Sequence, residues 1–348
     1  MISNILRKFK HRRDTERNDK TTFMMRNGER LLKELIASSN GKYNPYRIFS
    51  AEELRIATNN YDEQNIVLED PFRKLYKGFW QKRSISLMKY NGNRNQHALE
   101  WCINHIVYAS RMSHKHIIKL IGCCLETQIP IPVFESVQIG TLADRIHHHC
   151  EQHFEALSLT DRLKVAMDIA HAVAYLHVGF SRPIVYRDMK PTNILFNEQS
   201  DAKLFDFSLS LSIPDGETHI ELDYVEGTPG FIAPENFTTL INEQCDVYGF
   251  GAFLFELLTA QEVSDHVSFE SRFHYEENVK RLSGQNCRFK EMVDSIIIED
   301  KSCTCTGKEQ QLQAFKQLTL QCMDFSPEDR PTMVDVAKQL RQMYRSCM

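Results

Sequence analysis

The sequence predicts an α+β protein with two lobes, a small sheet-rich lobe followed by a larger helical one. Two observations carry this prediction. Residues 67–137 mix short β-rich runs with one helical stretch, and after Gly140 the apolar spacing is mostly that of helices. The length of 348 residues fits two core-sized units, and a composition of 42% hydrophobic and 25% charged residues is ordinary for a globular chain.

Composition and charge exclude several classes of function. With 42 Lys and Arg residues against 46 Asp and Glu residues, the net charge is -4, so no basic field favours nucleic acid as a partner. No apolar run is long enough to cross a bilayer, and Ile2 excludes N-myristoylation. Ten cysteines without a secretion signal predict reduced thiols and a cytoplasmic protein, with peripheral attachment to the plasma membrane in a complex as an alternative.

Two segments precede the sheet-rich lobe. Residues 1–26 are rich in Lys and Arg with little apolar content, which predicts a disordered basic tail. Residues 27–60 are predicted to be a helical extension. Apolar residues recur there at helical spacing: Leu31, Leu32, Leu35 and Ile36. Ser50, with Glu53 three residues later, is a capping box that opens a second helix over residues 51–59.

The sheet-rich lobe is predicted to span residues 61–138 and the helical lobe residues 139–348. In the first lobe the spacing predicts one helix, over 97–111. Its β-rich runs are 75–79, 85–89, 117–122 and 131–137. In the second lobe, residues 159–176 form one amphipathic pattern, and residues 247–258 are apolar on nearly all sides, which predicts a fully buried helix. Two further helices are predicted over 315–323 and 334–343.

One segment of the helical lobe carries residues suited to phosphoryl transfer. This chemistry needs a carboxylate to orient the acceptor hydroxyl, a cation over the transferring group and an amide oxygen on the metal. Asp188, Lys190 and Asn193 supply these groups at the required spacing, and Asp206 offers a second carboxylate for Mg²⁺. The metal ligands predicted here are therefore Asn193 and Asp206.

Three later segments extend the pattern. They are 227–235 (GTPGFIAPE), 246–251 (DVYGFG) and 329–333 (DRPTM). In this order the segments resemble the protein-kinase family, from about Phe49 to the C-terminus. The resemblance implies a bilobal kinase fold, with Glu235 and Arg330 as a buried ion pair. It also implies a nucleotide-binding set: Leu68, Leu75, Lys89 as the strand lysine that reaches the phosphates, and the hinge from Glu135 to Val137. Phe134 is expected at the back of the adenine pocket.

The expected phosphate loop departs from that family. Kinases cover the phosphates with a glycine-rich hairpin, because only glycine lets the backbone N–H groups approach the oxygens closely. Residues 68–75 contain no glycine, and Pro71 has no N–H to donate. Glu69 and Asp70 add like charge, which Arg73 and Lys74 offset only in part. An alternative is a kinase with an unusual loop that still binds ATP through the hinge.

Three more positions differ from an active kinase. Counting back from His114 places His105 where the family has the glutamate that pairs with the strand lysine, and Glu100 faces another side of the helix. A helix shifted by one turn is the alternative. Tyr186 replaces the usual histidine, and Ser208 replaces the glycine after Asp206 and Phe207. These changes predict a pseudokinase, so no cofactor is firmly expected, and Mg-ATP is expected only if nucleotide binding survives.

Two kinase-domain segments and the residues before the sheet sharpen the resemblance. Segments 116–126 (HIIKLIGCCLE) and 49–60, with Asn27-Gly28, Leu31-Leu32 and Gly41-Lys42, are similar to plant wall-associated-kinase-like proteins, and among them to a clade of receptor-like cytoplasmic pseudokinases. That resemblance implies an adaptor in plant immunity. The implied partners are the leucine-rich repeats of a coiled-coil NLR immune receptor, other receptor-like cytoplasmic kinases and bacterial effectors. The alternatives are an active Ser/Thr protein kinase and a structural scaffold without an immune role.

The segment between Asp206 and Glu235 is rich in hydroxyl residues. The candidate modification sites are Ser210, Ser212, Thr218 and Thr228. In active kinases phosphate on this segment orders it against arginines such as Arg187. Here the segment is expected to be an effector target or a docking surface, with an unimportant mobile loop as the alternative.

Overall fold

The computed structural model describes residues 18–35, 46–92, 96–138, 140–147, 156–238, 240–263, 289, 291–299 and 305–347. The chain divides into two compact units. The first comprises Met1–Ser113 and Ile118–Ile139, and the second comprises His114–Ile117 and Gly140–Met348. No helix of the described chain is long and apolar enough to cross a membrane.

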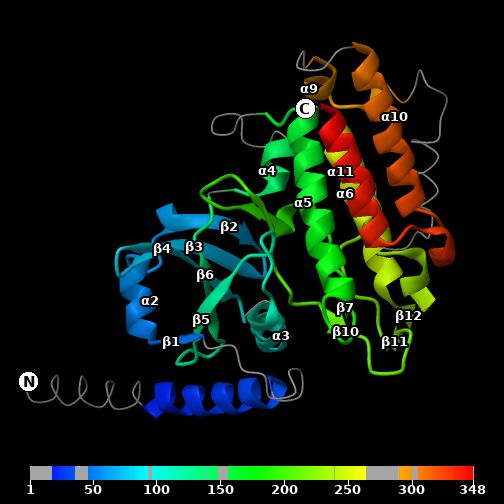
Figure 1. The fold of residues 1–348 in the computed structure, drawn as a ribbon. Coiled ribbons are helices and arrows are strands. Elements are labelled where there is room, and N and C mark those ends of the chain that lie inside the picture. Colours follow the sequence, from blue (N-terminus) through cyan, green and yellow to red (C-terminus); the bar gives the residue numbers. More distant parts are fainter. Residues whose placement is uncertain are drawn as a thin grey trace, which may run out of the picture. The chain divides into compact units, whose positions relative to one another are not determined.

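The first unit contains a six-stranded sheet in the order β1-β5-β6-β4-β3-β2 (Figure 1). All of its neighbours are antiparallel except β1 and β5, which run parallel. Its strands are β1 Arg47–Phe49, β2 Ile66–Asp70, β3 Arg73–Trp80, β4 Arg83–Tyr90, β5 Leu120–Cys124 and β6 Ile131–Glu135. Two helices accompany it, α2 (Ala51–Ala57) and α3 (Ala98–Arg111).

The two helices pack on opposite faces of the sheet. Leu54 of α2 lies in a buried cluster with Leu87 of β4 and Val133 of β6. The neighbouring residue of β6, Phe134, instead stacks on His105 of α3, with ring centroids 5.0 Å apart. Successive side chains of a strand point to opposite faces, so each strand contributes alternate residues to α2 and to α3. The capping box of Ser50 and Glu53 is present at the start of α2, as predicted.

The N-terminal extension differs from the prediction. Residues 18–35 form one helix, so the predicted disorder over 1–26 is wrong for residues 18–26. The side-chain amide of buried Asn27 donates to the carbonyls of Leu125 (3.1 Å) and Thr127 (2.9 Å), and Leu31 is buried. Tertiary contacts therefore stabilise a helix that local composition does not favour. Residues 1–17 and 36–45 lie outside the described chain.

The second unit is mainly helical, which together with the sheet of the first unit confirms the predicted α+β class. Helix α5 packs against α11, and α6 packs against α10 (Figure 1). Every residue of α6 from Cys245 to Thr259 is buried, as its apolar sequence predicts. The helices are α4 Leu142–Ile146, α5 Leu159–Val178, α6 Glu243–Thr259, α9 Ser295–Glu299, α10 Cys305–Cys322 and α11 Met333–Cys347. Three short ribbons pair β7 (Ile184–Val185) with β10 (Leu211–Ser212), β8 (Ile194–Phe196) with β9 (Ala202–Leu204) and β11 (Ile220–Glu221) with β12 (Leu240–Ile241).

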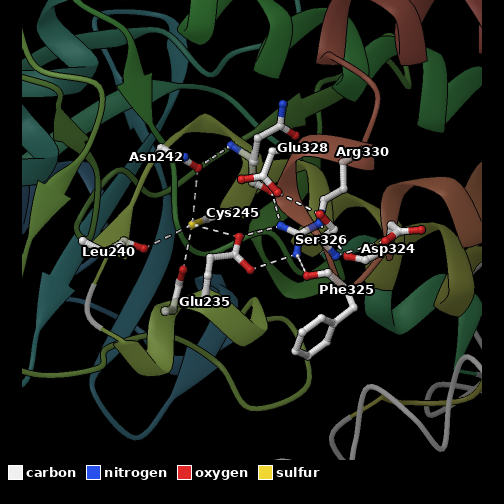
Figure 2. Close-up of polar contacts among 11 residues, drawn as sticks. Glu235, Leu240, Asn242, Cys245, Asp324, Phe325, Ser326, Glu328 and Arg330 are labelled. Carbon is white, nitrogen blue, oxygen red and sulfur yellow. Dashed lines mark hydrogen bonds and ion pairs between the residues drawn. The ribbon is translucent and has the colours of Figure 1, made fainter.

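A buried ion pair ties this unit together. Arg330 holds both carboxylate oxygens of Glu235, with N–O distances of 2.5 and 2.8 Å, as the family resemblance implies (Figure 2). Its Nη1 also donates to the carbonyl of Gln244 (2.9 Å) and its Nε to that of Asp324 (2.8 Å). The sulfur of Cys245 lies 3.5 Å from the same carboxylate. These additional hydrogen bonds offset the cost of burying the charge, so the pair joins the segment before β12 to the start of α6 and the approach to α11.

We predict that Asn27→Ala loosens the N-terminal helix. The substitution leaves two carbonyls without their donor, which costs about 1 to 3 kcal/mol. Amide hydrogen exchange of residues 18–35 is expected to accelerate roughly five- to 150-fold at that cost. Glu29→Ala, at an exposed position of the same helix, is the matched control and leaves exchange unchanged. Equal exchange in both variants would contradict the anchoring role of Asn27.

Candidate active site

The phosphoryl-transfer residues of the second unit form one hydrogen-bonded cluster. Buried Asn193 donates its side-chain amide to the carbonyl (2.9 Å) and carboxylate (2.8 Å) of Asp188. The ammonium of Lys190 lies 2.9 Å from the same carboxylate. The hydroxyl of Thr228 donates to Asp188 (2.7 Å) and accepts from Lys190 (2.9 Å). The structure therefore brings together the predicted acceptor-side residues Asp188, Lys190 and Asn193. It adds Thr228 to them, a residue predicted only as a modification site.

A second carboxylate fixes the loop that carries Asp188. Buried Asp246, at the start of α6, accepts the backbone N–H groups of Tyr186 (2.7 Å) and Arg187 (2.8 Å), and His177 lies 2.9 Å away. These bonds hold Arg187 in the left-handed region, at φ 72°. In the sequence, Asp246 belongs to the family-like segment 246–251 and has no predicted role of its own. A polar residue at the start of an otherwise apolar helix is the signal for that role.

Tyr186 and Ser208 are accommodated in the kinase fold without backbone strain at either position. Tyr186 is fully buried, its hydroxyl donates to the carbonyl of Phe205, and its ring meets Phe207 edge-on at 5.6 Å. The backbone N–H of Ser208 donates to the carboxylate of Asp206 (3.0 Å), and the positive φ of this turn, 60°, falls on Asp206. Since Ser208 lies outside the left-handed region, the expected backbone restriction at this position does not arise.

The first unit places Lys89 differently from the expectation. Its ammonium lies 3.9 Å from the centroid of the Tyr61 ring, after the end of α2. Leu87, two residues earlier on the same strand, belongs to the α2 cluster, so Lys89 shares the face that packs on α2. Burial lowers the pKa of Lys89, and among the described residues no carboxylate lies within ion-pair distance of it. The assignment of Lys89 as the phosphate-binding lysine is therefore wrong, because the strand turns this side chain away from α3.

Met88 occupies the face that the lysine of an active kinase would use. In that family the strand lysine pairs with a glutamate of the neighbouring helix, so it must face that helix. On β4, Tyr90 contacts α3, because its hydroxyl lies 3.0 Å from Nδ1 of His105. Met88 lies two residues before Tyr90, opposite Leu75, and is fully buried. An apolar thioether thus stands where the phosphate-binding cation is required.

The α3 residue at the position of the kinase glutamate, His105, is also uncharged. His105 is fully buried between Tyr90 and Phe134. Burial, and secondly the charge of Arg73, lower the pKa of His105 well below its usual range, so its imidazole is uncharged at neutral pH. Glu100 lies on the exposed side, where it pairs with His97 and Arg30. Helix α3 is thus not shifted by a turn to restore the pair.

The hinge donors are bonded within the chain. The backbone N–H of Glu135 donates to the carbonyl of Lys119 (2.9 Å). The backbone N–H of buried Val137 donates to the hydroxyl of Ser86 on β4 (3.3 Å). A nucleobase would have to displace the Ser86 hydroxyl to reach that N–H. The hinge from Glu135 to Val137 is therefore present, but the backbone N–H of Val137 already donates a hydrogen bond to Ser86.

The phosphate loop is a short, paired hairpin. Leu68 of β2 lies opposite Leu75 of β3, and Glu69 lies opposite Lys74 and forms an ion pair with it at 2.7 Å. Only Pro71 and Phe72 lie between the two strands. Such a turn offers no run of free N–H groups to a phosphate. The sequence prediction that this loop lacks the glycine cradle agrees with this geometry.

The candidate modification sites differ in access. Ser210 is fully buried and donates to the carbonyl of Tyr186 (3.3 Å), and Thr228 is bonded to Asp188. Ser212 is half-buried in β10, whereas Thr218 is exposed. Of the four candidate modification sites, Thr218 is therefore the exposed one, and Ser210 is too buried to be reached in this conformation. The carboxylate of Glu226 lies 3.8 Å from the guanidinium of Arg187, which in active kinases receives the phosphate.

The fold and the retained loop define a protein of the kinase class. The family model of the protein kinase domain matches residues 74–342, so the chain belongs to the protein kinase family. It is 34% identical over 320 residues to "Non-functional pseudokinase ZRK2" of Arabidopsis thaliana, covering 91% of this chain and 88% of that protein. It is 34% identical over 336 residues to "Serine/threonine-protein kinase ZRK1" of the same plant, covering 95% of each. "Putative wall-associated receptor kinase-like 16" is 32% identical over 335 residues, 96% of this chain and 75% of that protein. The predicted similarity to plant kinases is thereby confirmed.

We predict that Lys89 and Tyr61 stabilise the fold as a pair. In a double-mutant cycle, Lys89→Met and Tyr61→Leu are expected to show a coupling energy of about 0.5 to 2 kcal/mol, as for a partly buried cation–π contact. Urea unfolding of the four proteins measures it. Lys77→Met, on the opposite face of the same sheet, is the control and shows no coupling to Tyr61. Additive effects of the Lys89 and Tyr61 substitutions would mean that the contact contributes nothing.

Proposed function

We propose that this protein is a pseudokinase that acts as an adaptor in plant immunity. It retains the kinase fold and the loop around Asp188, and it has replaced the residues that hold the nucleotide phosphates. The observation that carries the loss of catalysis is the orientation of β4, which presents Met88 toward α3 and Lys89 toward α2. With Met88 at the β4 position that faces α3, no lysine stands there to contact the phosphates of ATP, which therefore lose one of the two contacts that kinases require.

The proposed partners are proteins. They are the leucine-rich repeats of a coiled-coil NLR immune receptor, other receptor-like cytoplasmic kinases, and bacterial effectors that modify such kinases. The likeness of residues 27–60 to the adaptor clade supports this role, and so does the similarity to a relative named as a pseudokinase. The net charge of -4 does not favour nucleic acid. In this role the protein acts in the cytoplasm, including at the plasma membrane within a complex.

A second candidate function is a weakly active Ser/Thr protein kinase. The cluster of Asp188, Lys190, Asn193 and Thr228 is intact, and a relative at 34% identity is named as a Ser/Thr kinase. Asn193 and Asp206 would then hold Mg²⁺, which would neutralise the phosphate charge. The same bonds also serve a structural purpose, because Asn193 fixes the Asp188 loop through the backbone carbonyl as well as the carboxylate.

Binding of Mg-ATP separates the two functions. A ligand that binds only the native state at a hundredfold excess over Kd stabilises it by about 2.7 kcal/mol. For the pseudokinase we expect no rise in Tm at millimolar Mg-ATP, measured by thermal shift, and no labelled phosphate on a generic substrate. An active kinase domain from a plant receptor kinase is the positive control. A clear shift, with phosphate transfer that Asp188→Asn abolishes, would establish the enzyme instead.

The adaptor role has its own test. Purified protein is expected to retain an NLR leucine-rich-repeat domain in a pull-down, and Asp188→Asn is expected to retain it equally, because recognition uses the surface and not the chemistry. Immune signalling in plants that carry Asp188→Asn should equal that with the unaltered chain. A protein that folds normally but binds no NLR repeat domain would be a scaffold of another kind. Loss of signalling with Asp188→Asn would favour the kinase.

A further inference from the structure

The turn between β2 and β3 is fastened by its own side chains. One carboxylate oxygen of Asp70 accepts the backbone N–H groups of Phe72 (2.8 Å) and Arg73 (3.0 Å), and the other accepts Nε of Arg73 (2.8 Å). The carbonyl of Phe72 accepts the N–H of Asn91, just after β4, at 2.7 Å. The turn is thus tied both to itself and to the neighbouring strand, which opposes opening of the hairpin.

The same turn reaches α3. The ring of Phe72 meets the ring of Trp101 edge-on, with centroids 5.9 Å apart and an interplanar angle of 83°, an attractive aromatic geometry. Trp101 lies one turn before His105 on the helix that the hairpin faces. The hairpin therefore has an attachment to α3, and it lacks the glycines of a phosphate cradle.

Arg73 supplies the buried cation on this side of the sheet. Its side chain is 7% exposed, it lies opposite Tyr90 in the register of β3 and β4, and it pairs with Asp70. Arg73, Leu75, Met88 and Tyr90 share one face by strand alternation. The guanidinium thus lies at the hairpin end of the face that in an active kinase covers the phosphates, and its charge is already balanced by Asp70.

We propose that the β2–β3 hairpin is a closed latch, in which Phe72 on Trp101 and Arg73 on Asp70 hold the hairpin against α3 without any nucleotide. The latch replaces the lysine–glutamate pair as the contact that positions α3. This goes beyond the loss of catalysis, because it makes the sheet and α3 one rigid surface whose shape does not depend on ATP. Neutral His105, bonded to Tyr90, completes the attachment of α3 to β4.

Fluorescence of Trp101 tests the latch in the full chain. The chain has two tryptophans, so Trp80→Phe leaves Trp101 as the reporter. In that background Phe72→Ala is expected to raise the acrylamide quenching constant of Trp101 at least twofold. Phe79→Ala, which removes a 62% exposed ring from β3, the strand that follows Phe72, is the matched control and leaves quenching unchanged. Equal quenching in the Phe72 and Phe79 variants overturns the proposal.

Hydrogen exchange provides a second readout that does not depend on Trp80. Phe72→Ala and Asp70→Asn, each in the otherwise unaltered chain, are expected to accelerate exchange of the α3 amides at least fivefold, with the helical unit unchanged. Millimolar Mg-ATP is expected to change neither that exchange nor the quenching of Trp101 in the chain with an intact hairpin. Unaltered α3 exchange in both variants, or added protection of α3 by Mg-ATP, overturns the latch. Binding of Mg-ATP without either change would contradict the proposed function and leave the latch intact.

Discussion

The alternation of side chains along strand β4 is the constraint that decides which residue of this strand faces α3, and with it whether a phosphate-binding lysine is present. Because alternate side chains of a strand face opposite sides, a shift of one residue exchanges the α2 face for the α3 face. The lysine of β4 stands at position 89 and lies on Tyr61, so the residue toward α3 is Met88. On the face of Met88, neutral His105 stacks on Phe134, and the buried cation Arg73 is paired with Asp70.

In the helical unit, hydrogen bonds and ion pairs compensate the buried charges of Asp246 and Arg330. Asp246 holds two backbone N–H groups of the Asp188 loop, and Arg330 holds Glu235 together with backbone carbonyls of the same unit. Removing one partner of such a pair leaves an uncompensated charge, which costs about 3 to 5 kcal/mol. Residues of this kind persist for stability whether or not a phosphate is transferred. Their retention is therefore compatible with a protein that recognises partners by shape.

Much of the fold was predictable from local patterns. The capping box at Ser50, the helix over residues 98–111 and the buried helix α6 all follow from spacing that a single element determines. The pair of Glu235 and Arg330 was predictable only through the family resemblance. The N-terminal helix was predicted too short, because residues 18–26 are stabilised by contacts of Arg26 and Asn27 with the turn after β5, a hundred residues away.

The sequence by itself determined that this chain has a kinase fold without a glycine-rich loop and without a glutamate at position 105, since both are statements about which residues are present. Only the tertiary structure decided that Lys89 lies on the α2 side of the sheet and Met88 on the α3 side. It also decided that Ser86 accepts the hinge N–H of Val137 and that Arg73 is buried against Asp70. The physical reason is that a strand pattern buried on both faces does not say which face packs on which helix. That choice is made by contacts between segments far apart in the chain.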